Sequence, residues 1–257
     1  SGWFAPRWNL EMGRSNTERY ELADGSRYVR TEQSQKGSGF EAWHNGHTLN
    51  YYFLDPQKQM FNASLNLNNN NYKNKYKGIL TDERLGGIEN NMYDRTEYIS
   101  LHPSLNLYYQ NNLKKDQLIM ANLVTSYETS HSHRLYNEND LATDAPMVNI
   151  DNLIKGKTFS VLGEVDYEKT WKNSRFTAGI RHTQSWIQNK YVEQNTIDRM
   201  NQGNSYIFGE YWLRLGNHFD GSVGLGYSLY HYAPQNRQSH TYSCLLYTSD
   251  AADERSS

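Results

Sequence analysis

A strict alternation of apolar and polar residues is the feature that most constrains this chain. In the segment 60–68, MFNASLNLN, every odd position from Phe61 to Leu67 is apolar, and every even position from Asn62 to Asn68 is Asn or Ser. Successive side chains of a β-strand point to opposite faces, so a period of two is typical of a strand with one apolar side. The segment therefore predicts a strand in an antiparallel sheet with one apolar and one polar face.

The segment before it predicts the other half of a hairpin. Residues 47–54, HTLNYYFL, alternate in the same way, and the intervening DPQK at 55–58 contains the Asp-Pro signal of a tight turn. One register then brings all apolar residues to the same face. The expected pairs are Phe53 with Phe61, Tyr51 with Ala63 and Leu49 with Leu65.

Three further hairpins follow the same rule. Their strands are expected at 98–109 with 117–127, 159–167 with 175–183, and 205–215 with 221–232. Aligning the apolar residues of the last two hairpins predicts these pairs: Tyr167 with Phe176, Leu213 with Val223, Tyr211 with Leu225, Gly209 with Tyr227, and Ile207 with Leu229.

The connections between hairpins are long, polar and rich in Asn, Asp, Gly and Lys, over 69–97, 130–156 and 188–203. Short turns at one end of the strands and long loops at the other are typical of an outer-membrane barrel. The fold class is therefore expected to be all-β: an antiparallel transmembrane β-barrel fragment of about ten strands, with short periplasmic turns and long extracellular loops. A soluble β-sandwich binding module, which also alternates, is the alternative.

The barrel hypothesis assigns each side chain to lipid or to the lumen. Lipid is expected to contact Phe61, Leu65, Leu105, Val165, Ile180, Tyr211 and Leu225. The lumen is expected to contain Asn62, Asn66, Asn106, Asp166, Arg181 and Ser228. Aromatic girdles at the strand ends are expected from Tyr51, Tyr109, Tyr127, Tyr167, Trp186 and Tyr232.

Composition supports a folded β-protein and argues against one class of partner. Aromatic residues make up 14% of the chain, which is too many for a disordered segment, although the mean hydropathy is only -0.90. Basic residues (26) and acidic residues (28) nearly balance. Because no basic field exists to attract phosphates, no nucleic acid partner is expected.

The C-terminal segment reads unlike the rest. CLLYTSDAADE, from Cys244 to Glu254, contains the only cysteine of the chain. Written back into codons, it resembles the transposase adapter that is ligated to DNA for short-read sequencing. We therefore expect a partial outer-membrane β-barrel at 1–243 and a non-native tail, translated from sequencing adapter, at 244–257.

Two longer stretches resemble the C-terminal barrel of TonB-dependent outer-membrane receptors. KTFSVLGEVDYEKTWKNSRFTAGIRHTQSWIQNKY is followed by NSYIFGEYWLRLGNHFDGSVGLGYSLY. The order of a D-Y strand end, a short turn, an A-G-I-R strand, a long connection and an F-x-E-Y strand is similar to that family. The matching positions are Asp166, Tyr167, Ala178, Gly179, Ile180, Arg181, Phe208, Glu210 and Tyr211.

The resemblance covers about residues 40 to 232. It implies a receptor in the bacterial outer membrane that imports a nutrient, such as a glycan, peptide or iron chelate, with TonB energy coupling. The implied partners are outer-membrane lipid, the TonB complex through a plug domain not contained in this sequence, a small nutrient ligand, and a surface lipoprotein. A passive porin and an outer-membrane hydrolase remain alternatives.

Candidate ligand contacts are the tyrosines of the polar connections, Tyr72, Tyr76, Tyr93 and Tyr136, whose rigid amphipathic rings suit sugars or peptides. Glu164, Asp166 and Arg181 share the expected lumen face, and we interpret them as a structural charge network because no Ser/His arrangement accompanies them. The two histidines of the HSH motif at 131–133 lack a third ligand at fixed spacing. No catalytic, metal or cofactor site is expected, and the chain is not expected to be an enzyme.

Overall fold

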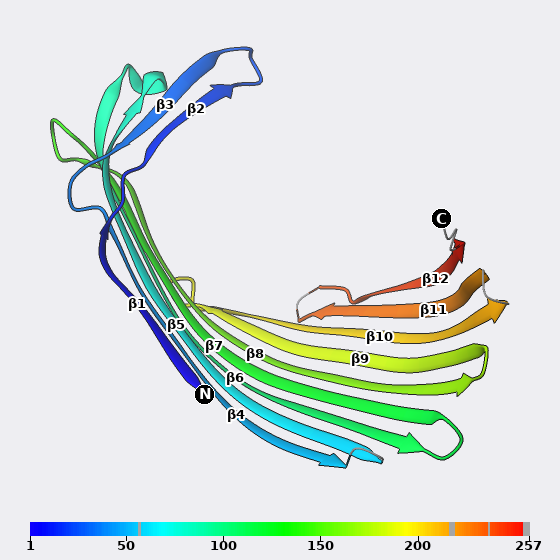
Figure 1. Ribbon diagram of the computed structural model, residues 1–257. Helices are drawn as coiled ribbons and strands as arrows, with labels where there is room; N and C mark the ends of the chain where they lie inside the picture. Colours follow the sequence, from blue (N-terminus) through cyan, green and yellow to red (C-terminus); the bar gives the residue numbers. More distant parts are fainter. Residues whose placement is uncertain (56–57, 216–218, 236, 254–257) are drawn as a thin grey trace.

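The computed structural model describes residues 1–55, 58–215, 219–235 and 237–253. Over these residues the chain forms one antiparallel sheet of 12 strands, strongly curved and open (Figure 1). β1 and β12 lie at its two edges and do not pair with each other. The all-β antiparallel prediction is confirmed. Among the described residues, no helix has the length and apolar character needed to cross a bilayer.

The strands follow each other in the sheet almost in chain order, β1-β4-β5-β6-β7-β8-β9-β10-β11-β12, and a β2–β3 hairpin joins β5 through β3. A short 3-10 helix, η1 (Glu83–Leu85), connects β5 to β6. The strand bounds are β1 (Gly2–Glu11), β2 (Ser15–Glu21), β3 (Arg27–Ser34), β4 (Gly39–Asp55), β5 (Gln59–Asp82), β6 (Ile88–Leu113), β7 (Gln117–Asp140), β8 (Pro146–Trp171), β9 (Ser174–Tyr191), β10 (Thr196–Leu215), β11 (Phe219–Pro234) and β12 (His240–Asp253).

The first hairpin has the predicted register. Phe53 pairs with Phe61, Tyr51 with Ala63, and Leu49 with Leu65. The pairing runs to Asp55 opposite Gln59. Pro56 and Gln57 of the expected turn lie outside the described residues.

The β8–β9 register differs from the prediction by two residues. Phe176 pairs with Lys169, and Tyr167 pairs with Ala178. Pairing continues to Trp171 opposite Ser174, so the turn is far tighter than the seven residues expected from EKTWKNS. A tight turn allows more backbone groups to pair. A shift of two residues leaves each side chain on the face expected for it.

The β10–β11 register is shifted by two in the same way. The observed pairs are Leu213 with Gly221, Tyr211 with Val223, Gly209 with Leu225, Ile207 with Tyr227, and Ser205 with Leu229. The Nε atom of Arg214 donates to the carboxylate of Asp220 directly opposite, at 2.9 Å, which stabilises this register. Of the turn expected at GNHFD, residues 216–218 lie outside the described residues.

The prediction of long loops is wrong, because the strands continue through these segments. β5 and β6 run on to residues 82 and 88, β7 and β8 to 140 and 146, and β9 and β10 to 191 and 196. Antiparallel pairing uses backbone groups, so a run of polar side chains does not end it. The connections at this end are residues 83–87, 141–145 and 192–195, and β6 and β8 are each 26 residues long.

The register confirms the two predicted faces. Paired residues share a face, and successive pairs link one apolar row across nine strands: Phe53, Phe61, Tyr109, Ala121, Val165, Ile180, Ile207, Tyr227 and Leu245. All residues predicted to contact lipid lie on this apolar face. All residues predicted for the lumen lie on the opposite, polar face. Of the expected girdle residues, Tyr232 alone is misplaced, because it pairs with Gln202 on the polar face.

The buried core of the described residues is small and lies at one end of the polar face. There the β2–β3 hairpin leans over the concave side of the sheet (Figure 1). Tyr76, Leu80 and Met92 form a buried cluster beneath it, and Tyr136 packs against them. We call this region the covered end. Nothing among the described residues covers the apolar face in a similar way.

The domain boundary expected after Ser243 falls inside β12. This strand pairs with β11 from His240 opposite Tyr232 to Asp253 opposite Phe219. The foreign origin of residues 244–257 stays a prediction, since strand pairing depends on the backbone and does not report where the coding sequence came from.

Candidate functional site

Three of the four candidate ligand-binding tyrosines lie on the polar face, and the fourth does not. Tyr72 stacks on Tyr98 with the ring centroids 5.2 Å apart. Tyr76 and Tyr136 occupy the covered end. Tyr93 pairs with Lys77 and Asn137, which places it on the opposite face of the sheet. The structure therefore does not bring the four rings into one surface, and their ligand-binding role stays a prediction.

Tyr76 is part of the packing of the covered end. Its side chain is only 4% exposed. The guanidinium of Arg14 lies 4.2 Å from the centre of its ring, a cation–π contact. Its hydroxyl donates to the backbone carbonyl of Arg14 at 3.4 Å. These contacts attach the chain leading into β2 to β5.

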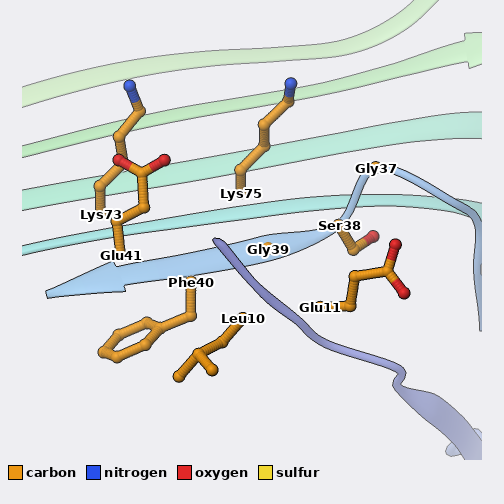
Figure 2. A pocket seen from close by; sticks show the side chains of 9 residues that line it. All are labelled: Leu10, Glu11, Gly37, Ser38, Gly39, Phe40, Glu41, Lys73 and Lys75. Atoms are coloured by element: carbon orange, nitrogen blue, oxygen red, sulfur yellow. The ribbon is translucent and has the colours of Figure 1, made fainter. Parts of the chain in front are cut away.

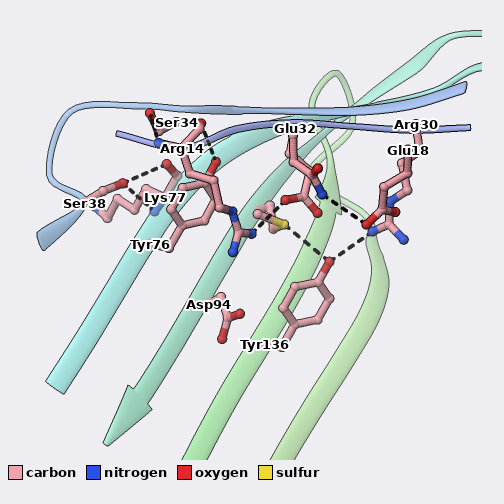
Figure 3. A network of polar contacts seen from close by, with 12 residues as sticks. Arg14, Glu18, Arg30, Glu32, Ser34, Ser38, Tyr76, Lys77, Asp94 and Tyr136 are labelled. Carbon is pink, nitrogen blue, oxygen red and sulfur yellow. Dashed lines mark hydrogen bonds and ion pairs between the residues drawn. The ribbon is translucent and has the colours of Figure 1, made fainter. Parts of the chain in front are cut away.

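Tyr136 belongs to a polar network that crosses from β3 to β7 (Figure 3). An Arg30 guanidinium nitrogen lies 2.7 Å from the Glu138 carboxylate and 3.2 Å from the Tyr136 hydroxyl. Tyr136 itself donates to Glu138 and contacts the sulfur of Met92. Burial, together with the bond to the Glu138 carboxylate, raises the pKa of Tyr136 well above its usual range. The hydroxyl therefore remains a donor at physiological pH.

A second ion pair fixes the other end of the hairpin. Arg14 lies 2.7 Å from Glu32, whose side chain is mostly buried. Ser38 accepts from the backbone N–H of Lys77 at 2.9 Å, and its hydroxyl donates to backbone carbonyls nearby. Sequence reasoning missed this network, because β2 and β3 carry no clean alternation and their partners are far along the chain.

A hollow of about 380 Å³ lies where β1 meets β4 and β5. Glu41, Lys73 and Lys75 project to one side of β4, and Phe40 and Leu10 project to the other (Figure 2). Lys73 also lies 3.3 Å from Glu97. The hollow contains charges of both signs, and one of its lysines already has a carboxylate partner. We therefore interpret it as a solvated strand surface and not as a site selective for one ion.

The central part of the polar face is a wall of hydroxyl and amide groups. One row of paired residues contains Thr48, Asn66, Ser104, Ser126, Ser160, Ser185, Gln202 and Tyr232. Ser160 and Ser185 are hydrogen-bonded at 2.8 Å, and Thr48 donates to Asn66 at 2.9 Å. Such a wall presents neutral donors and acceptors to any polar solute beside it.

The charge network expected on this wall is present. Arg181 pairs directly with Glu164, and its Nε donates to the carboxylate at 2.9 Å. Asp166 lies on the same face beside Gly179, and its Oδ1 atom is buried without a hydrogen-bond partner among the described residues. A β-carbon on Gly179 would clash with that oxygen and with the ring of Phe208, so a larger residue here requires those side chains to move. The Arg181–Glu164 pair joins β8 to β9.

The HSH histidines lie on the apolar side of the far strand ends. Nε2 of His133 is 2.8 Å from the Asp151 carboxylate. In the part of the chain that the structure describes, no three His, Cys, Asp or Glu side chains gather as metal ligands. His133 and Asp151 form a cross-strand pair that joins β7 to β8.

No protein-family model and no curated protein sequence matches the chain. Among solved structures, the chain is similar to the crystal structure of the outer membrane protease OmpT from Escherichia coli. The sequence identity is 10%, the comparison covers 97% of this chain and 94% of that chain, and the TM-score is 0.26. A likeness this weak assigns neither activity nor substrate to this chain.

The expectation that the chain is not an enzyme is corrected, because the reason for it was too narrow. Our expectation depended on the lack of a Ser/His arrangement in the sequence. General acid–base catalysis can use carboxylates and histidines without a serine nucleophile. The lack of a Ser/His arrangement therefore does not exclude an enzyme.

Proposed function

We propose that this chain forms part of the wall of a β-barrel in the bacterial outer membrane, with its apolar face toward lipid and its polar face toward the lumen. The observation that carries the proposal is the uncovered apolar row across nine strands. Leu49 is 70% exposed, and Leu225 is 56% exposed. Contiguous apolar surface on this scale marks a surface that contacts lipid or another protein.

The height of the apolar band fits a bilayer. On β8 the apolar face begins after Lys157 and ends at Lys169, 12 residues further along the strand. At about 3.3 Å per residue these lysines are roughly 40 Å apart along the strand. A strand tilt of about 40° reduces this to a height of roughly 30 Å, close to the hydrocarbon thickness of a membrane.

The polar wall supports a transport role for the lumen side. Its hydroxyl and amide groups offer hydrogen bonds to a hydrated solute without holding it by charge. We therefore propose import of a small polar nutrient, such as a glycan, peptide or iron chelate. The resemblance to TonB-dependent receptors supports energy coupling through a plug domain and a surface lipoprotein as a further partner.

Cysteine labelling in intact membranes tests the barrel. In a Cys244→Ser background, Leu105→Cys and Asn106→Cys place thiols on opposite faces of the same strand. A water-soluble maleimide is expected to label Asn106→Cys and to leave Leu105→Cys unlabelled until the membrane is dissolved and the protein denatured. Equal labelling of both in intact membranes would support the soluble sandwich instead.

Uptake assays test the transport role. Cells that express the full-length gene are given labelled oligosaccharides, short peptides or ferric chelates, with and without collapse of the proton gradient. Energised import predicts uptake that stops on collapse. Uptake that continues would show a passive porin, and hydrolysis of the solute by purified protein would show a hydrolase.

A further inference from the structure

We infer that a groove on the apolar face of β7–β11 binds a membrane lipid whose phosphate headgroup carries a net negative charge. The groove encloses about 400 Å³. Tyr127, Phe159 and Trp186 line it together with Lys157 and Arg199. We call it the cationic groove. The inference rests on the proposed membrane location, because only there does the apolar face meet lipid.

The floor of the groove is aromatic. Phe159 and Trp186 stack with centroids 5.5 Å apart and an interplanar angle of 19°. Tyr127 pairs with Phe159 and extends the row to β7. Aromatic rings are amphipathic surfaces that pack against acyl chains close to the headgroups of a bilayer. The floor thus suits the hydrocarbon part of a lipid.

The rim of the groove is cationic. Lys157 and Arg199 lie on either side of Gln188 in one row of paired residues, so they are two strand spacings, about 10 Å, apart. Arg199 donates to Gln188 at 3.1 Å. Both side chains are long enough to contact one phosphate between them. Guanidinium binds phosphate oxygens bidentately, and ammonium binds them as a point charge.

The next row adds two more cations. Lys155 and Lys190 are directly paired across β8 and β9. Like charges in directly opposite positions destabilise a sheet. No ion pair found in the described residues involves Lys155, Lys157, Lys190 or Arg199. Four neighbouring cations without a carboxylate partner form a concentration of positive charge that attracts an external anion.

Two cations of β5 and β6 on the same side of the sheet have a carboxylate partner. Lys73 lies 3.3 Å from Glu97, and Arg95 also pairs with Glu97. In the cationic groove, positive charge without a carboxylate partner lies beside an aromatic floor, at the edge of the apolar band. A lipid whose phosphate headgroup carries a net negative charge matches both the aromatic floor and the cationic rim.

The test is lipid binding to the full chain purified in a neutral detergent. Native mass spectrometry compares phosphatidic acid with phosphatidylcholine of the same acyl chains, and inorganic phosphate serves as the anion alone. Wild-type protein should prefer phosphatidic acid over both. The double variant Lys157→Gln/Arg199→Gln should weaken phosphatidic acid binding by at least about tenfold, because it removes two charge-assisted contacts. Phe159→Ala should weaken both lipids.

The matched control is Lys73→Gln/Arg95→Gln, which removes two cations that already have a partner and should not change lipid binding. Equal binding of both lipids, inorganic phosphate binding as tightly as phosphatidic acid, or an unchanged affinity in the Lys157→Gln/Arg199→Gln variant would each overturn the inference. If cysteine labelling places Leu105 in lipid and phosphatidic acid is still not preferred, this inference fails alone. If Leu105→Cys and Asn106→Cys are labelled equally in intact membranes, the membrane proposal itself is contradicted.

Discussion

The apolar band and the covered end belong to the same strands, but their apolar side chains differ in exposure. In the band, Leu49 and Leu225 expose 70% and 56% of their surface. At the covered end, Leu80 exposes 1% because β2 and β3 fold over it. Burial of apolar surface stabilises a fold by about 25 cal/mol per Å². The covered end gains that energy from the chain itself, and the band must gain it from an external apolar medium.

The largest expected effect comes from emptying the small core. Leu80→Ala should lower the free energy of unfolding by about 2–5 kcal/mol, since the cavity cannot be refilled by solvent. Leu49→Ala in the exposed band is the matched control and should cost far less. Guanidinium unfolding of both variants in lipid vesicles gives the comparison. Similar losses in the two variants would contradict the distinction between the two regions.

Charge on the band should cost almost as much. Leu65→Arg is expected to destabilise the membrane-inserted protein by about 2–4 kcal/mol, the cost of an arginine near the bilayer midplane. Asn106→Arg, on the exposed part of the polar face, should change stability little. Reversible unfolding from vesicles measures both. Equal tolerance would mean that the two faces meet the same solvent.

A glycine change should loosen the covered end alone. A β-carbon at Gly78 would lie 2.8 Å from the backbone oxygen of Gln33, so Gly78→Ala pushes β3 away from β5 at a cost of about 1–3 kcal/mol. Gly163→Ala is the control, because no atom lies within 4 Å of its added β-carbon. Hydrogen exchange should rise in β2 and β3 only for Gly78→Ala. Equal hydrogen-exchange protection of β2 and β3 in both variants would contradict the steric role of Gly78.

The smallest effect should be seen only at alkaline pH. Tyr136 has a pKa raised above its ordinary value of 10.0 in the folded protein. The unfolded chain therefore releases this proton first, and the stability it contributes is complete below pH 10 and is lost as the pH rises above it. Tyr136→Phe should flatten the stability profile above pH 10 relative to wild type. If the slope of unfolding free energy against pH is the same in both proteins, burial of this hydroxyl contributes nothing to stability.

Local sequence was enough to predict much of the wall. Period-two alternation assigned Phe61 and Asn62 to opposite faces, and the Asp-Pro signal in the sequence, together with the apolar alignment, predicted the first register. The other two specified registers were off by two, because alternation cannot distinguish positions that differ by a whole period. The polar connections were mistaken for loops, since polar side chains weaken the pattern while the backbone continues to pair.

The sequence by itself determined an antiparallel sheet with one apolar and one polar face, because that property follows from side-chain periodicity along each strand. Tertiary structure alone decided how far the strands run, where β2 and β3 cover the sheet, and that Tyr76 and Tyr136 enter a core. It also decided that Lys157 and Arg199 share a groove with Phe159 and Trp186. These features depend on contacts between residues far apart along the chain, and no local pattern encodes such contacts.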